Sequence, residues 1–329
     1  VYTGPFMFSD WKAGEEISFK AFKDSFVGAP QLDSIVFRVI KDPSASLAAL
    51  ETGEVQIAVV TADQVGSFAN NATYQVQDLL GARGQFVMFD FANPLFKDAR
   101  VREAFSRAID RKAVIASLFG GKGQENYALL PVTSWLYDKN QAKYPLDVSK
   151  AKQLLDSAGW QLGSDGVRTK GGQRFEFTMY TDVDKDSAVA IQPFLASVGI
   201  KFDVQALEEA TFINKASTGN YAAVMWAWSN YLVDPRRDLE FNLSSTQVAQ
   251  YNSYKNDQVD QLIKQAGTAT TQDQQTKLYD QVQEIAAMDV PYAYLWRQDT
   301  LVVSRKPLVV PSIKVYNELY YRAPSWRHA

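Results

Sequence analysis

Short runs of β-type residues alternate with segments of helical periodicity along nearly the whole chain, and this alternation constrains the fold more than any other feature. Residues 42–53 begin with Asp42 and Pro43 and stop at Gly53, which is typical of a helix with its start and stop signals. Within residues 98–111 the apolar side chains recur at helical spacing, and the arginines are predicted to lie on the opposite face. Because helices separate strands throughout, the sequence predicts an α/β layered architecture.

The predicted elements also suggest how the chain is divided. Helices are predicted at residues 42–53, 62–68, 98–111, 147–158, 187–197, 257–266 and 271–287. Strands are predicted at residues 2–8, 16–22, 34–40, 54–60, 85–91, 175–180, 201–205, 222–226, 300–304 and 313–316. The 329 residues are enough for about two domains. Because β-rich sequence opens and closes the chain, residues 1–83 with 299–329 are predicted to form one lobe and residues 84–298 the other.

The charge, cysteine and histidine counts exclude several classes of protein and site. With 34 Lys plus Arg against 37 Asp plus Glu, the net charge of −3 shows none of the basic excess expected of a free-standing nucleic-acid binder. The absence of cysteine excludes disulfides, a thiolate nucleophile and cysteine-ligated metals. The single histidine, His328, is predicted to be exposed tail, so a histidine-rich zinc site and an internal Ser-His-Asp triad are excluded as well.

Pairs of acidic residues leave an enzymatic function open. Glycosidases use two carboxyl groups on either side of the scissile bond. Neighbouring acids that could form such a pair occur three times, as Asp182 with Asp184, Asp234 with Asp238, and Glu208 with Glu209. Acids at these spacings are also ordinary on a solvated surface, and nothing in the sequence shows two of them facing each other. A glycoside hydrolase that uses a carboxylate pair therefore stays an alternative.

An aromatic cluster follows an apolar run in the second predicted lobe. Alternation along a strand places Trp226 and Trp228 on one face, where two indoles either fill core or form a platform for a ligand. Polar residues that include Asn230 and Tyr231 come next, and ligands of α/β sheets bind outside the carboxyl ends of strands. Trp135 is a further ligand candidate, because it lies in a predicted long loop.

Nine short motifs follow one another over nearly the whole chain. Four of them are Thr-Gly-Pro-Phe at 3–6, Leu-Glu-Thr-Gly-Glu-Val at 50–55, the run at 96–104, and Ala-Ile-Asp-Arg at 108–111. The others lie at residues 32–38, 151–160, 199–200, 256–262 and 289–291. In this order they resemble the family 5 extracellular solute-binding proteins, the oligopeptide and dipeptide receptors of ABC importers.

The resemblance implies a two-lobed α/β fold of the type II periplasmic-binding-protein kind. The first lobe would be incomplete, because family members are longer and begin well before the Thr-Gly-Pro motif. The implied function is that of the extracytoplasmic substrate-binding component of an ABC importer, which captures a peptide-class solute between its lobes. Closure would occur by hinge motion near residues 84–90 and 295–301. A chain that lacks part of the first lobe could also be a scaffold without binding capacity.

The same resemblance gives expectations about chemistry, partners and location. The protein would not be an enzyme and would need neither a cofactor nor a metal. Its partners would be a small-molecule or peptide ligand, the membrane subunits of an ABC permease, and the missing N-terminal segment of the same protein, with no nucleic acid. Its location would be periplasmic or at the cell surface, with a lipid anchor in that segment as one means of attachment.

The resemblance also supplies a hypothesis about the ligand. Peptide receptors of the family usually place an aspartate just after the tryptophan-bearing strand, where it pairs with the ligand's amino group, but this chain has Asn230 and Tyr231 there. Asp234 is the nearest acid, and Asp90 stands where the family tends to have asparagine. Loss of that carboxylate would remove most of the selection for a free amino terminus, so an oligosaccharide or other non-peptide solute stays an alternative. The predicted contacts are Trp226, Trp228, Asn230, Tyr231, Asp234, Trp135 and Asp90.

Overall fold

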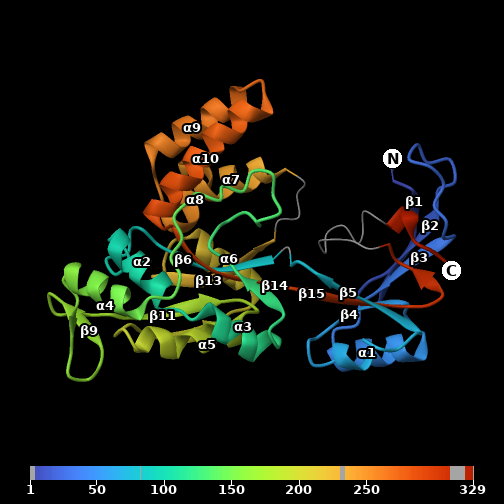
Figure 1. Cartoon of the computed structure of the whole chain (residues 1–329), viewed down its shortest axis with the longest axis horizontal. Coiled ribbons are helices and arrows are strands. Elements are labelled where there is room, and N and C mark those ends of the chain that lie inside the picture. The colour runs from blue at the N-terminus through green and yellow to red at the C-terminus, as the bar shows by residue number, and fades with distance from the viewer. Residues whose placement is uncertain (1–3, 82, 230–233, 312–322, 329) are drawn as a thin grey trace. The chain divides into compact units, whose positions relative to one another are not determined.

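The computed structural model describes residues 4–81, 83–229, 234–311 and 323–328 of the chain. Contacts between residues divide the chain into two compact units, the first from residues 1–82 with 298–329 and the second from residues 83–297 (Figure 1). The chain therefore passes from one unit to the other twice, at 82–83 and at 297–298. The predicted strand at 313–316 lies outside the described residues.

Unit 1 is built largely from antiparallel strands. One sheet has the order β1 (Phe6–Lys12), β2 (Glu16–Ala21) and β3 (Ser34–Arg38). A second has the order β4 (Ile57–Val60), β15 (Thr300–Arg305) and β5 (Tyr74–Leu79), so its central strand comes from the C-terminal part of the chain. A small third sheet pairs β16 (Leu308–Val309) with β17 (Arg327–His328), and His328 is exposed, as predicted.

The predicted helix at residues 42–53 is confirmed as α1 (Pro43–Thr52). Asp42 begins it by accepting a hydrogen bond from the Ala45 amide at 2.8 Å, and Gly53 ends it in the left-handed region at φ 82°. The helix predicted at residues 62–68 is wrong, because only the 3₁₀ turn η1 (Val65–Ser67) forms there. A segment this short gains too few hydrogen bonds to offset the cost of nucleating an α-helix. Another 3₁₀ turn, η2 (Ala323–Ser325), precedes β17.

Unit 2 is built on a six-stranded sheet. In spatial order its strands are β12 (Lys201–Ala206), β11 (Glu176–Thr181), β13 (Ala223–Ser229), β6 (Arg83–Phe89), β14 (Tyr292–Gln298) and β7 (Gly123–Glu125). The first three run parallel, whereas β6 is antiparallel to both β13 and β14. The carboxyl ends of β11, β12 and β13 therefore lie at the same end of the sheet as the start of β6.

Helices cover both faces of this sheet, which confirms the predicted α/β class (Figure 1). One face carries α2 (Ala99–Ala108), α3 (Arg111–Phe119), α4 (Val148–Ser157) and α5 (Lys185–Ala196). The other carries α6 (Glu209–Ser217), α7 (Pro235–Leu243), α8 (Ser245–Asn252), α9 (Asp257–Thr268) and α10 (Gln272–Asp289). Along β6, Val87 and Phe89 enter the first core cluster while Phe86 and Met88 enter the second. A small meander of β8 (Gln161–Leu162), β9 (Arg168–Lys170) and β10 (Gln173–Arg174) follows α4.

The predicted helix at residues 98–111 is wrong in its length, because the segment forms two helices. Ile109 has extended backbone, with φ −92° and ψ 120°, and it ends α2. Asp110 then begins α3 by accepting a hydrogen bond from the Ala113 amide at 3.0 Å. An aspartate inside an apolar periodic run is thus a helix start here, which the period alone does not reveal. Helices α7 and α8 are not predicted at all, because polar residues interrupt the apolar pattern of residues 235–252.

The prediction that the arginines of residues 98–111 lie opposite the core is wrong for Arg102 and Arg111, which are 3% and 1% exposed. Arg102 donates hydrogen bonds to four backbone carbonyls, those of Phe96, Lys97, Asp289 and Val290. Arg111 donates to backbone carbonyls that include that of Tyr294. Burial lowers the pKa of each guanidinium to about 10, so both stay charged at neutral pH. The buried arginines therefore join α2 and α3 to distant parts of unit 2.

Arg102→Ala is expected to lower the free energy of unfolding by about 3 kcal/mol, because several buried carbonyls lose their donor. Urea denaturation followed by circular dichroism measures this. Lys112→Ala is the matched control, since the Lys112 side chain is 81% exposed, and it should change stability by no more than about 0.5 kcal/mol. Equal effects of the two substitutions would contradict the structural role given to Arg102.

Candidate functional site

The candidate site lies at the end of the unit 2 sheet where β13 stops at Ser229 and β6 begins at Arg83, which we call the tryptophan end. Trp228 lies opposite Gly84 in the pairing of β13 with β6, and Arg297 lies opposite Gly84 in the pairing of β14 with β6. The chain enters and leaves unit 2 at these strand ends. Ligands of α/β sheets bind outside the carboxyl ends of strands, which is the end in question for β11 and β13.

A buried network holds Trp228. Its ring stacks on Phe241, with ring centres 5.0 Å apart and planes 17° apart, and its Nε1 donates a hydrogen bond to Oδ1 of Asp238 at 3.1 Å. Asp238 is 3% exposed and Arg297 is 4% exposed. Burial lowers the pKa of Arg297 to about 10, and the negative charge of Asp238 opposes this shift. Arg297 also donates to the Leu129 carbonyl at 2.6 Å, so both charges under the indole have buried partners.

Gly84 makes room for this network. A Cβ at Gly84 would lie 3.1 Å from Cζ of Arg297, closer than most real contacts allow, so a larger residue would displace the guanidinium. Trp226, two residues before Trp228, packs edge to face on Phe212 of α6 with ring centres 5.2 Å apart. Both indoles are only partly buried against the core under α6 to α10. Each therefore anchors in core through one part and leaves another part accessible, and ligand contact stays a prediction.

Polar groups gather at the same end of the sheet, and we call Arg83, Gln85, Thr181, Asp182 and Asp184 the Asp182 cluster. Arg83 donates to Oδ2 of Asp184 at 2.7 Å, and Asp184 makes no capping hydrogen bond although it precedes α5. Burial raises the pKa of Asp184, Arg83 opposes this shift, and the charge of Asp182 adds to it. Oδ1 of Asp182 and Oγ1 of Thr181 are shielded from solvent and accept or donate no hydrogen bond among the described residues.

Asp234 begins α7 and does not lie in an open loop. Its Oδ1 accepts a hydrogen bond from the Arg236 amide at 3.0 Å, and its carboxylate also accepts from the Arg236 guanidinium at 2.8 and 2.5 Å. These bonds hold the pKa of Asp234 below its usual value. A ligand amine would have to compete with Arg236, and a ligand role for Asp234 stays a prediction. Asn230 and Tyr231 lie outside the described residues.

The structure does not bring Trp135 and Asp90 to the tryptophan end by any described contact. Trp135 is 44% exposed in the turn-rich stretch between β7 and α4. Asp90 follows β6 at its far end, six residues from Gly84, which at about 3.3 Å per residue is roughly 20 Å away. Asp90 is 4% exposed, accepts a hydrogen bond from the Ala92 amide at 3.1 Å, and lines an open cleft of about 430 Å³. Asp90 is thus separated from the two indoles within unit 2.

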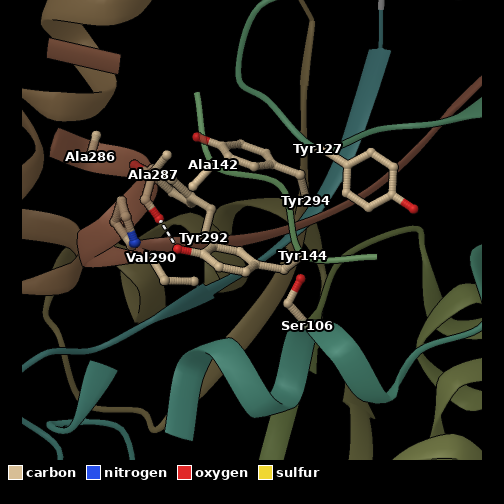
Figure 2. Close-up of a pocket in the computed structure, with 10 residues that line it drawn as sticks. Ser106, Tyr127, Ala142, Tyr144, Ala286, Ala287, Val290, Tyr292 and Tyr294 are labelled. Carbon is tan, nitrogen blue, oxygen red and sulfur yellow. Dashed lines mark hydrogen bonds between the residues drawn. The ribbon is translucent and has the colours of Figure 1, made fainter. Parts of the chain in front are cut away.

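A group of tyrosines forms a pocket elsewhere in unit 2 (Figure 2). Its aromatic lining consists of Tyr127, Tyr144, Tyr292 and Tyr294. The Tyr144 hydroxyl donates to the Ala287 carbonyl at 2.9 Å, which closes one side. The cavity volume is about 10 Å³, close to the minimum for one water molecule, so the pocket is too small for a solute.

The acid pairs that left a hydrolase open each contain a member with a structural partner. Asp184 pairs with Arg83, Asp234 pairs with Arg236, and Glu208 accepts hydrogen bonds from two amides at the start of α6. Among the described residues, no group of three or more His, Cys, Asp or Glu is placed to hold a metal ion. None of the helices in the described part of the chain has the length and apolar character needed to cross a membrane.

Sequence reasoning missed Arg83, Gln85 and Arg297 as parts of this end of the sheet. Arg83 comes just before the apolar run of β6, and Arg297 comes just after that of β14. A charged residue at the end of an apolar strand is common, so neither arginine stands out by itself. The one feature that could have indicated them is that β6 and β14, the strands they flank, are neighbours in the sheet. Strand order, which decides that they meet, is not contained in either local pattern.

Comparisons of the sequence and of the structure with known proteins point to the same family as the motifs. The family model "Bacterial extracellular solute-binding proteins, family 5 Middle" matches residues 1–250. The oligopeptide-binding protein AppA of Bacillus subtilis is 30% identical over 305 residues, which cover 90% of this chain and 56% of that protein. The solved structure of AppA from Bacillus subtilis in complex with a nonapeptide superposes with a TM-score of 0.80 at 29% identity, covering 99% of this chain and 66% of the other.

Heme-binding protein A of Haemophilus influenzae is 29% identical over 297 residues, which cover 89% of this chain and 53% of that protein. This chain therefore spans about half the length of these two relatives. The superposition confirms the predicted fold of the type II periplasmic-binding-protein kind. Since the family model covers more than half of the chain, the resemblance seen in the motifs is confirmed, and the chain belongs to the family 5 bacterial extracellular solute-binding proteins.

Proposed function

We propose that this protein is the extracytoplasmic substrate-binding component of an ABC importer and that it captures a peptide-class solute. The observation that carries the proposal is the pair of part-buried indoles at the tryptophan end, with Trp228 fixed from beneath by Asp238 and stacked on Phe241. An aromatic side chain that is already immobilised loses little conformational freedom when a ligand packs against it. Membership of a solute-binding family and similarity to an oligopeptide-binding protein support the same function.

The proposal extends to partners and location. The solute would be handed to the membrane subunits of an ABC permease, and binding would require no covalent chemistry. The protein would work in the periplasm or at the cell surface, where a lipid anchor would hold it. Polypeptide equivalent to the part of AppA that this chain does not span would complete the first lobe and add to the binding surface.

A titration with peptides tests the proposed function. A pool of peptides of two to nine residues should produce a saturable change in tryptophan fluorescence, and calorimetry should give a matching affinity, without any product in the mass spectrum. Hydrolysed products would favour the hydrolase, and binding of oligosaccharides but not of peptides would favour the non-peptide receptor. A native mass spectrum of the protein purified from its source would name the solute class directly through the mass of any bound ligand.

A further inference from the structure

An open groove of about 630 Å³ lies within unit 1, between β3 of one sheet and β4 of the other. Its walls contain every residue of β3, from Ser34 to Arg38, and the consecutive residues 57–59 of β4. Side chains alternate along a strand, so a groove over one face of a strand would touch only every second residue. Because consecutive residues line it, the groove runs along the edges of β3 and β4. Each of these strands ends its sheet and has a single neighbour among the described strands.

The two edges carry backbone groups that no described residue pairs with. Just after β3, the Val39 amide donates to the Glu15 carbonyl on the β2 side at 2.7 Å. In the other sheet, the Arg305 amide of β15 donates to the Gln56 carbonyl just before β4 at 2.8 Å. In an antiparallel ladder, the backbone groups of successive residues point alternately toward the partner strand and away from it. The residues whose N–H and C=O point into the groove are therefore Ser34, Val36, Arg38, Ile57 and Val59.

The groove has apolar walls that are incompletely covered. Val36 and Val59, which both line it, are each 49% exposed. The charged side chains in the walls pair with one another, because Arg38 forms ion pairs with both Glu16 and Glu54. Exposed apolar edge strands invite the addition of another strand, and folded proteins normally cover or block them. The groove is therefore suited to an extended apolar segment.

A buried indole in the groove wall also lacks a partner. Trp326 is 4% exposed and lines the groove. Its Nε1 is shielded from solvent and donates no hydrogen bond among the described residues. A buried tryptophan N–H usually finds an acceptor. A backbone carbonyl of a segment lying in the groove is an acceptor of the right kind.

Polypeptide of the same protein is the occupant that fits these walls best. The match covers 56% of AppA, which leaves 44% of that protein without a counterpart in this chain. A segment inside a longer polypeptide carries no terminal charges, in contrast to a free peptide, so it suits walls whose charges are already paired. A covalent connection to this chain would also give it a far higher effective concentration than a second copy has.

We propose that the groove binds an extended segment of this polypeptide, which adds as a strand along the open edges of β3 and β4. Its backbone pairs with the outward N–H and C=O groups of residues such as Val36 and Val59, and its apolar side chains cover the exposed walls. This inference rests on the proposed function, in which polypeptide equivalent to the rest of AppA completes the first lobe, and it names the surface where that polypeptide docks.

Amide hydrogen exchange of the full chain, with and without added peptides, tests the inference. The peptides are overlapping twelve-residue segments, blocked at both ends, from the part of AppA that the match does not cover. At least one of them should bind saturably and slow exchange of the Val36 and Val59 amides about tenfold, because these amides then donate to the added strand. The amides of Ile35 and Ala58 should not change, since they already donate within their own sheets. The readout is local, so binding of a peptide at the tryptophan end does not imitate it.

Two lysine variants assign the binding to the groove. Val59→Lys should weaken binding of that peptide about tenfold or more, because the added strand would take a solvated ammonium group out of water. Val39→Lys is the matched control, because Val39 is 53% exposed and does not line the groove, and it should keep the affinity within about twofold. Both side chains are exposed, so both variants should unfold at nearly the same urea concentration as the unmodified chain.

Four outcomes would overturn the inference. Binding of a peptide without slower exchange at Val36 and Val59 would place the peptide elsewhere, and absence of binding by every AppA peptide would leave the groove without this occupant. Equal effects of Val59→Lys and Val39→Lys would show that the groove wall is not the binding surface. Slower exchange at Val36 and Val59 as the chain alone is concentrated would assign the groove to a second copy. Failure of the proposed function would appear instead in the solute titration, which is read from tryptophan fluorescence and not from these amides.

Discussion

Asp238→Ala is expected to lower the free energy of unfolding by about 3–5 kcal/mol, because it removes one partner of a buried pair of charges and leaves the other uncompensated. Asp238 is buried, accepts the hydrogen bond of the Trp228 indole, and opposes the burial-driven pKa shift of Arg297. Its loss would leave the Arg297 guanidinium with carbonyl partners such as that of Leu129 and the indole N–H without an acceptor. Chemical denaturation of the purified chain measures the effect.

Asp238→Asn separates the two roles of this residue. The amide oxygen still accepts a hydrogen bond from Trp228 Nε1, but the negative charge is gone, so stability should fall while the orientation of the indole is kept. The near-ultraviolet circular dichroism of the tryptophans reports the orientation independently of stability. Unchanged stability in both variants would show that Asp238 does not compensate Arg297.

Trp228→Ala is expected to weaken solute binding by about 30-fold, which corresponds to roughly 2 kcal/mol for a central aromatic anchor. The indole is fixed by the stack on Phe241 and by the bond to Asp238, so truncation removes a contact surface that is already ordered. The substitution should also lower stability, since part of the ring packs against the core under α6 to α10. Calorimetric titration with the peptide pool and denaturation of the same sample give the two quantities separately.

Trp228→Phe is the control for this experiment. Phenylalanine can keep the stack on Phe241 but cannot donate to Asp238, so most of the affinity should return while stability recovers only in part. Unchanged affinity in Trp228→Ala together with lowered stability would assign the residue to the core alone. That result would remove the principal support that the structure gives to the tryptophan end as a ligand surface.

The sequence predicts those parts of the fold that depend on local pattern. Alternation correctly places Trp226 and Trp228 on one face of β13, and the aspartate, proline and glycine signals correctly bound α1. The β-rich run at 85–91 corresponds to β6, whose alternate residues fill two cores. In each case the information lies within a few residues along the chain, because it concerns which side of one element faces apolar surroundings.

What the sequence cannot predict depends on partners far away in the chain. Arg102 looks like a surface residue of an amphipathic helix, yet it is buried because it binds the carbonyl of Asp289, 187 residues later. Asp90 and Trp228 are both among the predicted ligand contacts, yet the length of β6 separates them within unit 2. The Asp182 cluster also depends on strand order, since Arg83 meets Asp184 across 101 residues. Local periodicity does not predict contacts between residues so far apart in the sequence.

The position of β15 at the centre of the β4–β15–β5 sheet determines when this sheet can form during synthesis of the chain. In that sheet β4 and β5 each pair with β15 and not with each other, so neither has its neighbour until residues 300–305 have been made. The whole of unit 2, residues 83–297, is synthesised in the interval, which at 5–20 residues per second takes on the order of ten seconds or more. During that time β4 and β5 lack the strand that joins them, so the second sheet of unit 1 can form only after unit 2 has been synthesised.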